Sequence, residues 1–209
     1  MTATFKKLIE KMAGQKAPGP SATFTVSHVF FALELMAGKA IGRNKLAKQL
    51  NVGEGAVRTI ISRLKQAGLI QISKEGCSLT SKGLNVWKTF EEYFPTRVDI
   101  GKIDLTGAEH NYAFLVKNSG QKVRSGIEQR DAAIVAGGKR AVIIVSKNGR
   151  LAIESVSNSL EEEFPQAASQ ILKYIHPENN DVIVIVGAAV PQKAKHAAFA
   201  ASWVLLDDH

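Results

Sequence analysis

The residues best suited to chemistry lie in one stretch of the sequence, 54–67, which reads EGAVRTIISRLKQA. Val57, Ile60 and Leu64 recur at the spacing of one helical face, so we expect them to point into a core. The opposite face would then be free to bind. Arg58 lies one turn into this helix, and the fork of an arginine can bond guanine O6 and N7 together. Arg58 is therefore the principal candidate for reading a base in duplex DNA.

The other candidate DNA-binding residues surround Arg58 or lie on neighbouring elements. Thr59 and Ser62 could touch bases or phosphates, and Gly55 leaves room for close approach of a DNA backbone near a helix end. Two cations and an amide lie at the start of the preceding helix, and a lysine lies in the turn of the following hairpin. These residues could contact phosphates or the adjacent minor groove. The complete set is Arg58, Thr59, Ser62, Glu54, Gly55, Arg63, Arg43, Asn44, Lys45 and Lys74. Two of these have an alternative interpretation, Arg63 as a solvated charge and Gly55 as a helix-start residue.

The elements around this helix follow a recognisable order. Apolar spacing predicts helices over 27–38 and 42–50, then a tight turn at 51–53 before the helix 54–67. A glycine at 68 fits a helix C-cap, and 69–79 reads as a short hairpin. A further helix begins at Thr80 or Ser81 and stops before Pro95. These elements follow the order of a winged helix-turn-helix domain, which is helix, helix, turn, helix, hairpin and helix.

Residues 41–87 resemble the winged-helix transcriptional regulators of bacteria and archaea. The resemblance is carried by "LAKQL", "VRTIISRLKQAGLI" and "LTSKG", which occur in the usual order. Together with the second half of the chain, "VGEGAVRT" is similar to an archaeal family of winged-helix regulators whose second domain has no settled function. The resemblance implies a winged helix with its second motif helix in the major groove.

Charge is unevenly distributed between the two halves of the chain. Residues 1–97 contain fifteen Lys and Arg and six Asp and Glu, which gives a formal charge of +9. Residues 98–209 contain twelve Lys and Arg and thirteen Asp and Glu, which gives a formal charge of −1. The whole excess of +8 therefore belongs to the first half. Such asymmetry favours a polyanion as partner of the winged helix, and double-stranded DNA is the partner we expect.

The second half predicts an α+β domain. Strands are expected over 112–117, 141–146, 151–155 and 181–186, with helices over 127–136, 160–175 and 191–206. This order, β-α-β-β-α-β with a terminal helix, predicts a ferredoxin-like sheet. Residues 98–110 read as a linker or irregular strand. We therefore expect three segments: a mobile N-terminal arm or short docking helix at 1–22, the winged helix-turn-helix domain at 23–97, and a dimerisation or effector-sensing domain at 98–209.

No catalytic set stands out in either half. The five histidines share no metal-ligand spacing with each other or with Cys77, so we expect no metal and no cofactor. The polar cluster Arg124, Glu128, Arg130 and Asp131 could line an effector site, although an ion-paired helix face is the simpler interpretation. Two alternatives to a regulator stay open: an enzyme whose catalytic second domain carries a regulatory winged helix, and a winged-helix module that docks protein.

The remaining expectations concern assembly and compartment. A single winged helix covers one half-site, so we expect a homodimer that pairs through the second domain, by the alanine-rich helix 191–206 or by the apolar face of the sheet. The alternative for this helix is that its alanines pack on their own sheet. A small-molecule effector is a further expectation for the second domain. One cysteine and the lack of a long apolar run indicate a cytoplasmic protein that does not insert into membranes.

Overall fold

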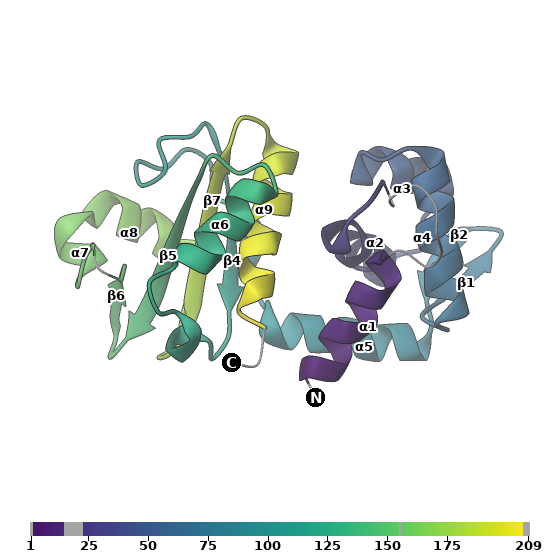
Figure 1. Ribbon diagram of the computed structural model, residues 1–209, viewed down its shortest axis with the longest axis horizontal. Helices are drawn as coiled ribbons and strands as arrows, with labels where there is room; N and C mark the ends of the chain where they lie inside the picture. The colour runs from purple at the N-terminus through teal and green to yellow at the C-terminus, as the bar shows by residue number, and fades with distance from the viewer. Residues whose placement is uncertain (1, 15–22, 155, 207–209) are drawn as a thin grey trace. The chain divides into compact units, whose positions relative to one another are not determined.

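The computed structural model describes residues 2–14, 23–154 and 156–206, and the chain folds as two compact units, Met1–Phe90 and Glu91–His209 (Figure 1). Each unit has its own core. Within the described ranges, no helix is both long enough and apolar enough to cross a bilayer.

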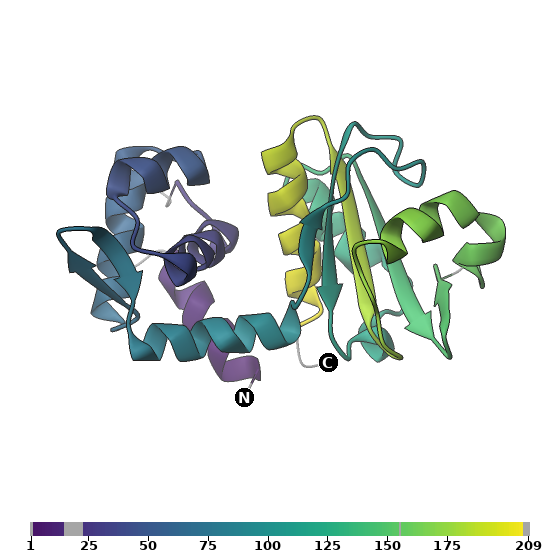
Figure 2. The same cartoon turned by 180° about the vertical axis from the view of Figure 1, so that it is seen from behind.

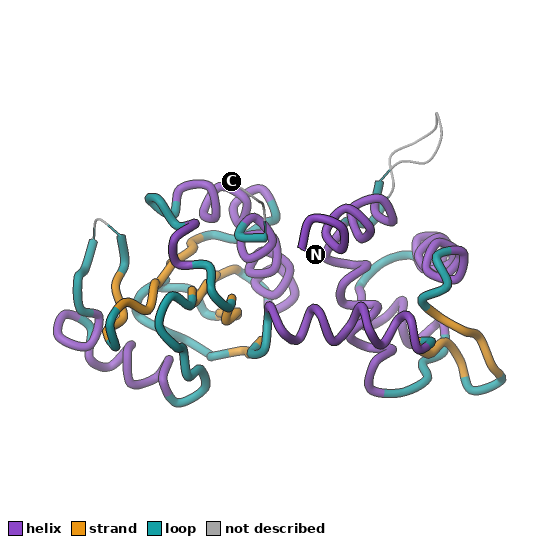
Figure 3. Tube along the Cα trace, turned by 90° about the horizontal axis from the view of Figure 1, so that it is seen from below, coloured by secondary structure: helices purple, strands orange, loops and turns teal. Residues whose placement is uncertain are grey.

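The N-terminal unit is built from helices around one two-stranded hairpin. In chain order its described elements are α1 (Thr2–Ala13), α2 (Val26–Gly38), α3 (Arg43–Leu50), α4 (Glu54–Gln66), β1 (Ile70–Ser73), β2 (Gly76–Leu79) and α5 (Ser81–Tyr93), the last of which continues into the second unit. The helix-turn-helix order and the hairpin expected from the sequence are both present. We call the β1–β2 hairpin the wing, and Figure 3 shows its two strands extending beyond the helices.

Helices α3 and α4 are joined by a turn that the sequence prepares. Asn51 ends α3 in the left-handed conformation, with φ of 53°, and its backbone N–H bonds back to the helix. Asparagine tolerates this conformation better than most residues, which allows the chain to reverse within three residues. On α4, Val57, Ile60 and Leu64 are almost completely buried. Burial of this face fixes which residues of α4 point outward.

The wing is tied to the residue that precedes α3. Ile41 and Cys77 exchange two backbone hydrogen bonds of 2.9 Å, forming an isolated antiparallel bridge. Gly76, next to Cys77, has a φ of +129°, and a Cβ there would lie 2.5 Å from the carbonyl carbon of Ile41. Only glycine fits this close approach.

We expect Gly76→Ala to lower the free energy of unfolding of the N-terminal unit by about 2 to 4 kcal/mol, because the new methyl group meets backbone and the φ value is strained. Denaturant unfolding followed by circular dichroism measures this loss. Gly42→Ala is the matched control, since nothing lies within 4 Å of a Cβ at that position. Equal stability of the two variants would contradict the steric argument.

The segment expected to be a mobile arm or a short docking helix begins with a helix. Residues 2–13 form α1, in which Phe5, Ile9 and Met12 are buried. Phe5 packs edge-on against Phe90 of α5 at 4.4 Å between ring centroids. Spacing of these apolar residues at three and four positions gives α1 one apolar face, which the core of the unit accommodates. Residues 15–22 of the expected arm lie outside the described residues.

The second unit contains a five-stranded sheet. Its elements are β3 (Arg97–Asp99), β4 (His110–Val116), the 3₁₀ turn η1 (Gly120–Lys122), α6 (Ile127–Val135), β5 (Arg140–Lys147), β6 (Arg150–Ala152), α7 (Leu160–Glu163), α8 (Pro165–Leu172), β7 (Val182–Ala188) and α9 (Pro191–Val204). The helix expected over 160–175 is divided in two. Its break falls at Phe164, because a proline disfavours helical geometry in the residue before it.

The order of the strands departs from the ferredoxin-like sheet that the sequence predicts. The sheet runs β3-β4-β7-β5-β6 and every neighbouring pair is antiparallel. The additional edge strand, β3, overlaps the start of the segment 98–110, which was expected to be a linker or an irregular strand. All seven residues of β7 are buried, and the strand takes the central position between β4 and β5. A strand that is apolar on both faces is most stable where both faces are covered.

Helices cover the sheet on both faces. One face buries Ile144, Ile183 and Ile185 together with Ile171 of α8. The other face packs against α6 and α9, which also contact each other (Figures 1 and 2). Most alanines of α9 are buried in this packing, including Ala194 and Ala197. The small residues of α9 thus allow close approach to its own sheet and to α6.

Candidate nucleic-acid interface

A cationic hollow of about 650 Å³ lies between α4 and the wing. Arg43 from α3, and Arg58 and Lys65 from α4, line it, and all three are exposed. Ser62 lies between the two α4 cations along the same stripe, at positions i, i+4 and i+7 of the helix. The surface thus offers three positive charges and a hydroxyl on a concave face, the arrangement that suits a phosphate backbone.

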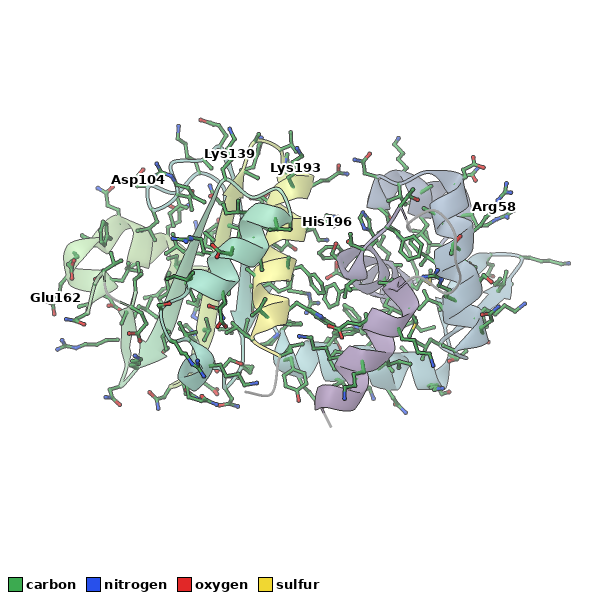
Figure 4. All side chains as sticks on the ribbon, in the orientation of Figure 1. Arg58, Asp104, Lys139, Glu162, Lys193 and His196 are labelled. Atoms are coloured by element: carbon green, nitrogen blue, oxygen red, sulfur yellow. The ribbon has the colours of Figure 1, made fainter. Side chains whose placement is uncertain are left out.

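Arg58 is held loosely. Its Nη2 atom lies 3.7 Å from Oε2 of Glu54, one turn earlier on α4, and both side chains are about two-thirds exposed, at 68% and 69%. Figure 4 shows Arg58 pointing away from the body of the unit. An exposed pair of this kind contributes little energy, so a phosphate or a base edge can replace Glu54 as its partner.

The backbone of α4 is accessible at its first turn. Gly55 is exposed, and a Cβ at this position would meet nothing within 4 Å, so internal packing does not require a glycine. Glycine also weakens a helix relative to alanine. Thr59 is half-buried, and its hydroxyl donates a hydrogen bond of 3.0 Å to the carbonyl of Gly55. This bond orients the threonine along the helix and leaves its oxygen able to accept.

Three further predicted residues, Asn44, Lys45 and Lys74, are exposed but do not line the hollow. Of the candidates on α3, only Arg43 lines it. Lys74 is in the turn between the two wing strands. Their exposure leaves them free to contact a longer segment of backbone.

Arg63 has a different position from the other predicted residues. Its Nη1 atom donates hydrogen bonds of 2.6 and 2.7 Å to the backbone carbonyls of Met12 and Gly14, at the end of α1. Its guanidinium also lies 5.1 Å from the ring centroid of Phe24. Helix carbonyls carry partial negative charge, so this arginine neutralises and caps the C-terminal end of α1. Arg63 thus links α4 to α1 within the unit.

We expect Arg63→Ala to lower the free energy of unfolding by about 1 to 3 kcal/mol, because two charge-assisted hydrogen bonds to α1 are lost. Lys65→Ala is the control two residues later, where the side chain is exposed and has no such bonds. It should leave stability unchanged and reduce the slope of log binding constant against log salt by about 1. The opposite pattern, with Arg63→Ala changing the salt slope and not stability, would place Arg63 at the DNA. Denaturant unfolding and fluorescence anisotropy measure the two effects.

Seven of the ten residues that line the hollow were absent from the predicted site, and Lys65 and Ile72 are two of them. Lys65 could have been included from the sequence, because it continues the stripe of Arg58 and Ser62 at helical spacing. Ile72 of β1 carries no comparable signal. It is 53% exposed and lines the hollow, although the strand pattern would have placed it inward.

Cys77 lines the hollow and is 2% exposed. Burial raises the pKa of its thiol, an effect that the nearby charge of Arg43 offsets only in part. The thiol therefore stays protonated at neutral pH, and a protonated buried thiol is a poor nucleophile. Its part in the hollow is to pack and to pair with Ile41.

Comparisons with known proteins match the two parts of the chain to two different family models. Residues 30–94 match the family model described as the CggR N-terminal DNA binding domain. Residues 107–205 match a domain of unknown function, DUF4443. No curated protein matches the chain.

A solved structure resembles most of the chain. This is the hypothetical protein PH0730 from Pyrococcus horikoshii OT3, which is 28% identical, with a TM-score of 0.71 over 87% of this chain and 92% of the other. The protein thus combines an N-terminal DNA-binding domain of a transcription-regulator family with a C-terminal sheet domain whose family has no assigned function.

Proposed function

We propose that this protein is a sequence-specific transcriptional regulator that inserts α4 into the major groove of DNA. The observation that carries the proposal is the stripe of Arg58, Ser62 and Lys65, which shares one hollow with Arg43. In this arrangement Arg58 reads guanine, Ser62 contacts a base or phosphate, and the other two cations hold the backbone. Glu54 is the resting partner of Arg58 until DNA is bound.

The other predicted residues would extend the contact beyond the hollow. Gly55 lets a phosphate approach the backbone N–H groups at the first turn of α4, where the helix dipole favours negative charge. Asn44 and Lys45 at α3 and Lys74 in the wing would contact phosphates on either side. Thr59 would contribute its hydroxyl oxygen. The chemistry of this set favours duplex DNA over a protein partner, because its members are mainly cations and small polar groups.

We expect Arg58→Ala to cost about 1 to 3 kcal/mol at the preferred site and to relax the base preference at one or two positions. Enrichment of a genomic fragment pool by the two proteins measures both effects. Lys48→Ala is the control, because Lys48 is an exposed lysine of α3 outside the hollow. If the Arg58 variant enriched the same sites with the same affinity, base reading by Arg58 would be excluded. If the unsubstituted protein enriched no sequence, the proposed function would fail.

We also propose that the protein binds as a homodimer through its second unit. One winged helix covers only half a site, and two linked copies gain affinity by reading two half-sites about one helical turn apart. The buried alanines of α9 pack against the sheet and α6 of their own unit, so they do not form an exposed surface. The outer side of α6 is the better surface, since Ile127, Ile134 and Val135 are 49%, 44% and 89% exposed.

Sedimentation of the 209-residue chain should show a dimer, and the double substitution Ile134→Ser and Val135→Ser should shift it toward monomer by removing apolar area from the interface. Val190→Ser is a control, since Val190 is an apolar residue elsewhere in the unit that is as exposed as Ile134, at 44%. A strict monomer, both free and on a two-half-site DNA, would rule out dimeric binding.

The second unit would also couple a small molecule to DNA binding. Two concavities of suitable size support this role. One, of about 360 Å³, is mainly apolar and is lined by Val142, Ile153 and Phe164, with Arg130 at its rim. Arg130 pairs with Asp131 at 3.2 Å, so the polar cluster expected here is at least partly an ion pair. The other concavity is polar.

A further inference from the structure

The second concavity of the C-terminal unit lies at the end of the sheet where β7 finishes and β5 begins. It encloses about 390 Å³ and is lined by Thr106, Gly107, Ala108, Glu109, Lys139, Arg140, Ala188 and Ala189. Four of the eight lining residues are alanine or glycine, which leaves room for a bound group to approach the backbone. The walls of this hollow come from three separate segments of the chain, 106–109, 139–140 and 188–189.

Uncompensated positive charge marks this hollow. Lys139 and Arg140 are exposed, and among the described residues no carboxylate lies within ion-pair distance of either. Glu109 is the acidic residue of the lining, and it is 3.1 Å from Lys102. The side chain of Lys193 lies beside the segment that leads to Lys139, since a Cβ on Gly137 would lie 3.5 Å from it. Figure 4 shows Lys139 and Lys193 at the same end of the unit.

The positive charge of this hollow contrasts with the net charge of its unit. Residues 98–209 carry a formal charge of −1, and several of their lysines and arginines are in ion pairs, as in Lys117 with Asp181 at 2.8 Å. Adjacent cations without counterions repel each other and are stabilised by a bound anion. Lys139 and Arg140 line the hollow without a carboxylate partner, and this arrangement favours a ligand of negative charge.

The wall opposite the cations is rigid. Asn111, which is 1% exposed, donates hydrogen bonds of 2.9 Å to the carbonyls of Gly101 and Ala108, and it accepts one from Thr106. Gln170 of α8 holds the same loop through the carbonyl of Ile100 at 2.7 Å. A ligand would thus meet a preformed wall and would not have to order it.

Contact between this loop and β7 requires a glycine. A Cβ on Gly187 would lie 2.6 Å from Cβ of Ala108 and 2.7 Å from Oδ1 of Asn111. The loop therefore packs directly on the end of β7, and the backbone of Gly187 also accepts a hydrogen bond of 2.8 Å from the N–H of Lys139. One buried glycine joins the loop and the cationic segment, which are the two walls of the hollow.

We propose that this hollow binds a small multivalent anion, a phosphorylated or polycarboxylate molecule, with Lys139 and Arg140 as its charged ligands. Arg140 supplies a planar fork for two oxygens, and Lys139 supplies a point charge beside it. The proposal that this anion regulates DNA binding rests on the proposed function. The proposal that the hollow binds an anion does not depend on it.

The test is isothermal titration calorimetry of the 209-residue chain, without DNA and at constant ionic strength, using pyrophosphate and citrate as separate probes. Saturable binding of one anion per chain is expected for at least one probe, and the comparison tells phosphate from carboxylate recognition. The double substitution Lys139→Gln and Arg140→Gln should weaken binding by about tenfold or more, because two charge-assisted contacts are lost. Ala189→Leu, which fills the hollow without changing charge, should weaken it as well.

The matched control is Arg124→Gln with Lys173→Gln, which removes the same charge from exposed positions outside the lining of the hollow. Thermal unfolding of each variant separates loss of binding from loss of fold. The proposal would be overturned by no saturable binding, by equal weakening in the control pair, or by loss of anion binding in Arg58→Gln with Lys65→Gln. It would also fail if the Lys139 and Arg140 variant lost DNA affinity and no small anion bound. DNA enrichment is measured separately, so failure here leaves the proposed function testable.

Discussion

The geometry of the candidate interface depends on the backbone bridge between Ile41 and Cys77. This pair of hydrogen bonds fixes the wing beside the start of α3, and Gly76 makes it feasible because any side chain would collide with Ile41. Without the bridge, a hairpin of two four-residue strands would be only marginally ordered. With it, Arg43 from one element and Arg58 from another border the same hollow.

A second constraint acts on the C-terminal unit through the apolar strand β7. Because all seven of its residues are buried, the strand must lie inside the sheet with helices on both faces. Its end then brings the start of β5 and the loop before β4 together. The polar hollow with Lys139 and Arg140 is a consequence of that convergence, and ligand sites commonly form where strands from distant segments end together.

Within the N-terminal unit, cations of similar sequence appearance have different roles. Arg58, Arg63 and Lys65 all lie on the outward part of α4, yet Arg63 is turned to the carbonyls that end α1. The difference arises from α1, whose docking brings a negative helix end beside one arginine and not the others. A residue's availability for DNA is thus set by a helix some fifty positions earlier in the chain, and not by α4 alone.

Local patterns in the sequence determined the winged-helix order. Apolar spacing gave the helices, Asn51 and Gly68 marked their ends, and the face opposite Val57 and Leu64 indicated Arg58 and Ser62, because helical periodicity is a local property. The sequence also localised the positive charge to the first half. Tertiary structure alone decided the strand order, the residues that α1 contacts, the role of Arg63 and both hollows, because each depends on which distant segments meet. Those pairings are selected by the burial of whole faces, which no single window of sequence contains.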